Sequence, residues 1–244
     1  MNKKTFISHI NPLILKGVAH RGLHNEEFTE NGLKAFKNAI EHNVALELDV
    51  HLTKDNQLIV CHDSDLKRTT GKVGIIEELT VEQIKNHYKL FDGGSVPTLQ
   101  EVLDLVNEQV PILVELKSWK NNNRPLAKRA VEELKRIKDK KNIVIIAFDP
   151  RALLYFGKKG FMRSLLIAKS DYYTWHFRFF FESIDIEHVL LTDKKVMRYQ
   201  RKHMVNTWTI ETKEDFEKAL PHIDLVTFQH LDVDFIKENM SKKY

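Results

Sequence analysis

The sequence predicts an α/β protein, a closed (β/α)8 TIM barrel formed by residues 1–244 as a single domain. Short apolar stretches alternate with longer stretches whose apolar residues recur at helical spacing, as in a parallel sheet covered by helices. The length of 244 residues fits the roughly 250 residues of one such barrel. No internal repeat or shift in composition marks a second domain. A doubly wound open sheet has the same alternation and stays an alternative.

The individual elements follow from this alternation. The expected strands, of which the sixth is the least regular, are Val18–His20, Ala45–Val50, Ile112–Lys117, Ile143–Phe148, Ser164–Ala168, His188–Leu191, Val205–Ile210 and Leu225–Gln229. The expected helices are Glu30–His42, Thr98–Val106, Arg124–Lys138, Pro150–Lys158, Lys194–Lys202, Thr212–Leu220 and Val233–Met240. Residues 51–95 are expected to be an insertion between the second strand and its helix, with a short helix that begins at Thr80 as N-cap. The stretch DYYTWHFRFFF at 171–181 is aromatic and basic and has no clean periodicity.

The second strand carries the strongest chemical signal. In ALELDVHL at 45–52, apolar residues alternate with Glu47, Asp49 and His51, so the two carboxylates leave the same face. A hairpin turning at Asp55-Asn56 would place Asp49 opposite His62, and opposed residues have Cβ atoms about 4.5–5.5 Å apart. Two carboxylates on one face repel each other unless a cation lies between them. The segment is therefore either a divalent-cation site with oxygen ligands or a solvated polar hairpin.

Composition limits the classes of partner and location. The net charge is +4, with Lys and Arg scattered over helical stretches, so no nucleic-acid partner is expected. Cys61 is the only cysteine, which excludes an intrachain disulfide and a cysteine metal cluster. The first residues make a poor signal peptide, and no apolar run approaches the ~18–20 residues of a membrane span. A cytoplasmic protein without stable membrane insertion is expected, and its oligomeric state stays open.

Several motifs together resemble those of the glycerophosphodiester phosphodiesterases. They are, in chain order, AHRG at 19–22, TENGLKAF at 29–36, ELDV with TKDNQLIV and HDSDLKRTTG within 47–71, VPTLQEVL at 96–103 and VELK at 114–117. The resemblance is dense over the first half of the chain and thin afterwards, and it partly guides the count of eight strands. It implies a small-molecule substrate and metal-dependent hydrolysis of glycerophosphodiesters to glycerol 3-phosphate and an alcohol, a reaction of glycerol and lipid metabolism.

The resemblance also implies roles for particular residues. In barrels of this kind the site lies at the C-terminal ends of the strands, where the matching positions fall. Glu47, Asp49 and Glu115 match metal ligands, with Mg²⁺ and Ca²⁺ equally suited. His20 and His62 match the general acid and base, and Arg21 matches a phosphate contact. Lys117 shares a face with Glu115 and either contacts substrate or forms an interior ion pair with it. Trp208 matches an aromatic near the substrate but is equally suited to core packing.

Other residues leave alternatives open. Asp63 either orients a neighbouring group or caps its loop, and Arg68 either acts in the site or makes structural hydrogen bonds. Four further histidines are expected at the surface: His24, His42, His51 and His87.

The chain also departs from the family pattern in places. Thr29 and Gly32 stand where the family usually has Pro and Thr, Glu211 stands where it has Asn, and the last strand lacks the usual Gly-rich run. Two alternatives therefore remain. One is release of a cyclic phosphate from a lipid or polymeric diester, and the other is a non-catalytic phosphate-binding protein.

Overall fold

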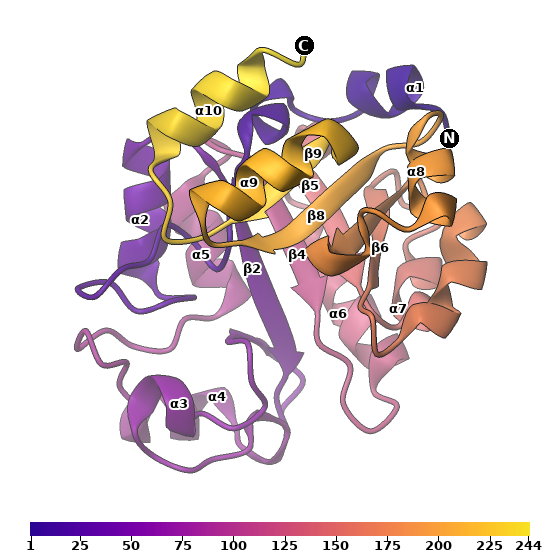
Figure 1. Ribbon diagram of the computed structural model, residues 1–244. Helices are drawn as coiled ribbons and strands as arrows, with labels where there is room; N and C mark the ends of the chain where they lie inside the picture. The colour runs from indigo at the N-terminus through magenta and orange to yellow at the C-terminus, as the bar shows by residue number, and fades with distance from the viewer.

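Eight parallel strands close into a barrel in the computed structural model, which describes residues 1–244 (Figure 1). They follow one another around the barrel in the order β1, β2, β4, β5, β6, β7, β8, β9, and β9 pairs with β1 to close it. The barrel strands are β1 (Val18–Ala19), β2 (Ala45–Leu52), β4 (Ile112–Leu116), β5 (Ile143–Ala147), β6 (Met162–Ile167), β7 (Ser183–Glu187), β8 (Val205–Ile210) and β9 (Leu225–Phe228). The predicted fold class is confirmed, and the open sheet is excluded.

Helices and 3-10 turns surround these strands. The helices are α1 (Lys3–Ser8), α2 (Leu33–Glu41), α3 (Lys67–Thr70), α4 (Val81–His87), α5 (Leu99–Val106), α6 (Asn123–Leu134), α7 (Pro150–Tyr155), α8 (Lys194–Gln200), α9 (Lys213–Ala219) and α10 (Val233–Ser241). The 3-10 segments are η1 (Pro12–Lys16), η2 (Ile76–Glu78), η3 (Lys140–Asn142), η4 (Tyr172–Phe180), η5 (His188–Leu190) and η6 (Leu220–His222). Thr80 and Thr98 each begin a helix with a full capping box. No helix is long and apolar enough to cross a bilayer.

The alternation in the strands separates two apolar layers. Leu46, Leu48 and Val50 of β2 pack outward in a cluster of 50 buried residues between the strands and the helices. The alternate positions of β2 face into the barrel, where Ala45 belongs to a second cluster of 13 buried residues. Glu47 therefore points into the barrel interior.

The amino-terminal segment closes one end of the barrel. Phe6 of α1 and Ile14 of η1 belong to the interior cluster and are almost completely buried. Figure 1 shows α1 at the end opposite the arrowheads of β2 and β4. Phe6 and Ile14 thus fill the end of the barrel opposite these arrowheads.

Residues between β2 and α5 form a separate excursion at the arrowhead end of β2 (Figure 1). The strand β3 (Leu58–Val60) runs antiparallel to β2, and α3, η2 and α4 follow it. The excursion has its own apolar cluster of eight buried residues, among them Leu66 and Ile84.

Two sequence expectations need correction. The sixth barrel strand is Ser183–Glu187, and the expected residues His188–Leu191 instead begin with the turn η5. Asp185 interrupts the apolar pattern of that strand, which hides it from a search for apolar runs. The hairpin register is also shifted, because Val50 pairs with Val60 and Asp49 lies across from Cys61 rather than His62. The loop is one residue longer than a two-residue turn, and its Asn56 adopts a left-handed conformation (φ 58°).

Candidate active site

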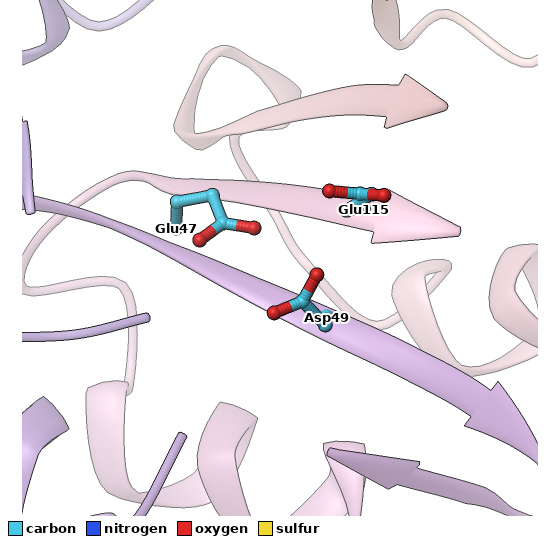
Figure 2. Close-up of side chains that lie close together, drawn as sticks. All are labelled: Glu47, Asp49 and Glu115. Carbon is cyan, nitrogen blue, oxygen red and sulfur yellow. The ribbon is translucent and has the colours of Figure 1, made fainter. Parts of the chain in front are cut away.

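Three carboxylates from adjacent strands meet inside the barrel (Figure 2). Glu47 and Asp49 leave the same face of β2, and the parallel register places Asp49 beside Glu115 of β4. One oxygen from each residue lies within 4.8 Å of the other two. The exposed fractions of Glu47, Asp49 and Glu115 are 2%, 0% and 8%. The two-residue spacing on β2 and the strand register together produce this cluster.

Two cations only partly offset this negative charge. The Lys117 Nζ donates to Glu115 Oε1 at 2.8 Å and lies 3.4 Å from Asp49 Oδ1. The Arg21 Nε lies 3.6 Å from Asp49 Oδ2, and the Arg21 backbone N–H donates to Glu47 Oε2 at 2.8 Å. The three buried carboxylates can carry more negative charge than the two cationic side chains offset. A further cation at this place would therefore be favourable.

The three carboxyl groups respond differently to this environment. Burial raises the pKa of Glu47 well above its ordinary value, and the charges of Asp49 and Glu115 raise it further. Burial also raises the pKa of Glu115, although Lys117 opposes that shift. Burial acts in the same direction on Asp49, but Lys117 and other nearby positive groups outweigh it and hold its pKa below the ordinary value. Glu47 is the carboxylate with the least compensation.

The buried cluster contains unsatisfied oxygen atoms that fit a divalent cation. Glu47 Oε1 and Asp49 Oδ1 are buried and accept no hydrogen bond. A buried carboxylate oxygen without a hydrogen bond carries a large desolvation cost, although Lys117 Nζ at 3.4 Å partly offsets it at Asp49 Oδ1. Oxygen ligands arranged in this way are those that Mg²⁺ and Ca²⁺ prefer, so the donor set fits either ion. Asn31 fixes the carboxylate of Asp49, because its side-chain Nδ2 donates to Asp49 Oδ2 at 2.9 Å.

His20 lies beside this cluster at the end of β1, oriented by the last strand. Its Nδ1 lies 2.6 Å from Gln229 Oε1, and Gln229 Nε2 donates to Glu211 Oε1 at 2.8 Å. The Gln229 oxygen can only accept, so the proton sits on His20 Nδ1. No hydrogen bond engages His20 Nε2. Burial lowers the pKa of His20 to about 4, and the Arg21 charge adds to this effect.

His62 lies on the excursion side of the site, where a carboxylate and an arginine orient it. Its Nδ1 is 2.6 Å from Asp63 Oδ1, and Arg68 Nε donates to Asp63 Oδ2 at 2.6 Å. Asp63 therefore orients His62, which is one of the two roles expected for it from the sequence. Arg68 also donates to Glu30, which in turn accepts a hydrogen bond from Arg21 at 2.9 Å. Burial lowers the pKa of His62, against the opposing charge of Asp49.

One expected surface histidine is buried. His51 is only 3% exposed, with Nδ1 at 2.7 Å from Glu77 Oε1 and Nε2 at 3.0 Å from the backbone oxygen of His62. It fastens the main chain that carries His62 to β2, so the surface expectation is wrong for His51. Of the other three histidines expected at the surface, His42 and His87 are exposed and His24 is half-buried.

The predicted residues surround a pocket of about 110 Å³. Seven of the eight predicted site residues line it: His20, Arg21, Glu47, His62, Glu115, Lys117 and Trp208. Asp49 does not line the pocket itself, but it contacts two residues that do, Arg21 and Lys117.

Strands of the second half supply the other wall of this pocket. The side chains of Ile146, Phe148 and Leu166 are apolar, and the Phe148 ring meets the edge of Trp208 at 5.5 Å between centroids. Trp208 Nε1 donates to the backbone oxygen of Asp185 at 3.1 Å, which fixes the orientation of the indole. Trp208 is partly exposed at the pocket and also packs against the interior apolar cluster.

Several residues of the site carry no local sequence signal. Gln229 contacts a histidine 209 positions away, and Asn31 contacts a carboxylate 18 positions away. Asp185 is 1% exposed and has one unpaired oxygen near the pocket. Asn31 stands inside the TENG motif, but its role appears only once α2 has packed against β2.

Comparisons with known proteins agree with this geometry. Residues 20–223 match the glycerophosphoryl diester phosphodiesterase family. A glycerophosphodiester phosphodiesterase of Caldanaerobacter subterraneus subsp. tengcongensis is 28% identical over 216 residues, which cover 83% of this chain and 88% of that protein.

Solved structures share the fold. A glycerophosphodiester phosphodiesterase of Parabacteroides distasonis superposes with a TM-score of 0.78 at 24% identity, covering 93% of this chain and 96% of the other. A phosphodiesterase of Oleispira antarctica, solved in complex with the product sn-glycerol-3-phosphate, gives a TM-score of 0.78 at 20% identity, covering 92% and 94% of the two chains.

Proposed function

The chain belongs to the glycerophosphoryl diester phosphodiesterase family, and from this premise we propose that it hydrolyses glycerophosphodiesters to glycerol 3-phosphate and an alcohol, with a divalent cation as cofactor. The expectation of an enzyme is confirmed by this membership and by the relatives. The observation that carries the proposal is the convergence of three buried carboxylates and two oriented histidines on one pocket.

The carboxylates would supply the metal site. Glu47, Asp49 and Glu115 would hold Mg²⁺ or Ca²⁺, which would offset the negative charge that develops on the phosphate oxygens. The buried Glu47 Oε1 and Asp49 Oδ1, which accept no hydrogen bond, support this assignment. Arg21 and Lys117 line the same pocket and would contact the remaining phosphate oxygens with their charged N–H groups.

The two histidines are the proposed proton carriers. Hydrolysis needs one group that accepts a proton from the attacking water and another that donates one to the leaving alkoxide. In His20 and in His62, Nδ1 is held by an oxygen acceptor, which leaves Nε2 free for the transfer. The Asp63 carboxylate beside His62 stabilises the charged imidazolium, as the third group of a catalytic array does.

The apolar wall would contact the substrate away from the phosphate. Trp208 and Phe148 present ring surfaces to a pocket of about 110 Å³, which favours a small diester over a polymer. The product bound to the Oleispira antarctica phosphodiesterase, sn-glycerol-3-phosphate, supports the same class of substrate.

The direct test is an assay of product release. Purified protein is incubated with glycerophosphocholine or glycerophosphoethanolamine, in Mg²⁺, in Ca²⁺ and in chelator, and glycerol 3-phosphate is measured enzymatically. We expect release with at least one ion and none in chelator. Failure to release it from either diester with either ion would refute the proposal. Phosphorus NMR of the same mixtures tests the cyclic-phosphate alternative, because cyclic and open phosphates resonate at different positions.

A further inference from the structure

The segment between β6 and β7 exposes an unusual number of aromatic rings. The nine-residue 3-10 segment η4 stands where other barrel units have an α-helix. Its Thr174 and Trp175 are buried against the barrel, whereas Tyr173, Phe179 and Phe180 are 70%, 66% and 62% exposed. Exposed apolar patches of this kind commonly mark an interaction site.

The neighbouring helix α8 adds positive charge to the same surface. An open hollow of about 400 Å³ lies between η4 and α8, and no carboxylate lines it. Four of its lining residues are Arg178, Lys195, Arg198 and Lys202, and none of them forms an ion pair. The decapeptide 194–203 contains five Lys and Arg residues and no acidic residue. We call η4, α8 and this hollow the aromatic–basic surface.

The cations and rings form one continuous surface. The Arg178 guanidinium lies 3.8 Å from the centroid of the Phe179 ring and 4.3 Å from that of Trp175. Phe179 also packs against Tyr199 of α8, with 6.2 Å between ring centroids. In Figure 1, α7 and α8 lie on the same side of the barrel, with the chain of η4 between them. None of these residues lines the catalytic pocket.

The chemistry of this surface selects among the classes of partner. Self-association through it would bring unpaired cations together without carboxylates to receive them. A nucleic acid would stack on the rings, but Leu154 of α7, the helix that packs against η4, and Met197 of α8 are exposed aliphatic side chains, which offer no stacking face. An anionic bilayer accepts all three features, because rings and aliphatic groups enter the interface while Lys and Arg meet the headgroups.

We propose that the aromatic–basic surface docks the protein peripherally on an anionic phospholipid membrane. Phe179 and Phe180 would enter the headgroup region, and Arg198 and Lys202 would lie against the lipid phosphates. The contact needs no spanning segment, in keeping with the absence of any helix able to cross a bilayer. The proposal is independent of the hydrolytic function.

The test is sedimentation with vesicles. The native protein should sediment with vesicles of mixed phosphatidylglycerol and phosphatidylcholine, should not sediment with phosphatidylcholine alone, and should be released by salt. Arg198→Glu with Lys202→Glu should weaken binding by about tenfold or more. The matched control, Arg124→Glu with Lys128→Glu on α6, makes the same change in net charge at exposed residues without ion pairs and should bind like the native protein.

A second pair of variants tests the rings. Phe179→Ser with Phe180→Ser should also weaken vesicle binding, whereas Phe91→Ser, at a ring that is 70% exposed on the excursion, should not. Hydrolysis of soluble glycerophosphocholine and the melting temperature should be unchanged in both surface variants, which shows that they fold. Absence of native binding to anionic vesicles, or equal loss in the control variants, would overturn the proposal. So would binding of a single-stranded oligonucleotide to this surface in place of vesicles.

Discussion

The two halves of the barrel contribute opposite kinds of side chain to one pocket. The half from β1 to β4, with the excursion, supplies charged and titratable groups: His20, Arg21, Glu47, His62, Glu115 and Lys117. The half from β5 to β9 supplies an apolar wall in which Asp185 is the only acidic residue: Ile146, Phe148, Leu166, Asp185, Trp208, Thr209 and Thr227. The reaction chemistry is thus concentrated on one side, and the other side shapes the space next to it.

The buried carboxyl groups of the two halves differ in their charged neighbours and in their pKa values. In the first half, Asp49 has Lys117 and Arg21 within 3.6 Å, and its pKa lies below the ordinary value despite burial. In the second half, Asp185 has only the amide of Asn206 as a hydrogen-bond partner at 2.7 Å, and burial raises its pKa to about 7. Burial favours the neutral acid unless cations are near. The cations of the first half therefore hold Asp49 in its charged form, whereas the pKa values of Glu47 and Glu115 in that half, and of Asp185 in the other, are raised by burial.

Glu47→Gln should cause the largest loss of activity. The change keeps the shape of the side chain but removes one negative charge from the proposed metal site. Loss of a proton-transfer group costs roughly 10²–10⁴-fold in rate. We expect a larger fall in kcat here, because the variant loses both the bound cation and the charge balance of the site. Asp185→Asn makes the same chemical change in the second half and should retain most activity. Similar losses in the two variants would break the division between the halves.

His62→Ala should come next. The variant should fold, bind metal and bind substrate, yet lose about 10²–10⁴-fold in kcat, because it removes a positioned proton carrier but no oxygen ligand. The measurements are kcat at saturating metal and the affinity for the ion, with exposed His42→Ala as the control. A loss of metal affinity as large as that of Glu47→Gln would make His62 a ligand, and near-native kcat would remove it from the mechanism.

Gln229→Leu tests the one point where the second half acts on the reaction chemistry. Without the Gln229 oxygen, His20 is no longer held with its proton on Nδ1. We expect kcat to fall about 10- to 100-fold with KM nearly unchanged, a typical cost of losing an orienting partner. In Glu211→Gln the Gln229 oxygen still faces His20, so kcat should stay near the native value. A rise in KM with native kcat would assign Gln229 to substrate contact instead.

Trp208→Ala should affect the choice of substrate more than the reaction itself. Loss of the ring removes a face for the ammonium group of either alcohol, a contact worth about 1 kcal/mol, or roughly fivefold in kcat/KM. The effect should differ between glycerophosphocholine and glycerophosphoethanolamine, because their alcohols differ in apolar surface. Equal losses on the two diesters would show that Trp208 acts only through core packing.

Asp185 should affect stability and its pH dependence rather than activity. Its pKa is about 7 in the fold against 3.8 for the ordinary group. Between these values the unfolded chain has released the proton and the folded chain has kept it, so rising pH favours unfolding. Stability relative to Asp185→Asn should fall by roughly 1 kcal/mol per pH unit across this window. Denaturant unfolding in chelator measures it, and a parallel pH dependence in the two proteins would contradict the pKa.

The sequence was informative where local pattern determines structure. Alternation in β2 places Glu47 and Asp49 on one inward face, and capping residues mark the starts of α4 and α5. The gathering of Glu115 with them followed from its place at the end of the next barrel strand, which the register confirms.

Long-range and loop geometry were less accessible. One extra loop residue shifted the hairpin register, which pattern alone does not fix when both faces are buried. His62 still lines the pocket, because the chain beyond β3 turns toward it. The role of Gln229 depends on closure of the barrel between β9 and β1, and no spacing in the sequence encodes that contact.

The most direct test of the division between the halves is calorimetric titration of Mg²⁺ and Ca²⁺ into three proteins. The native chain and Asp185→Asn should each bind one ion with similar affinity, and Glu47→Gln should bind at least tenfold more weakly, because it alone removes charge from the oxygen cluster. Native affinity in Glu47→Gln, or loss of binding in Asp185→Asn, would contradict the account and move the cation to the other side of the pocket.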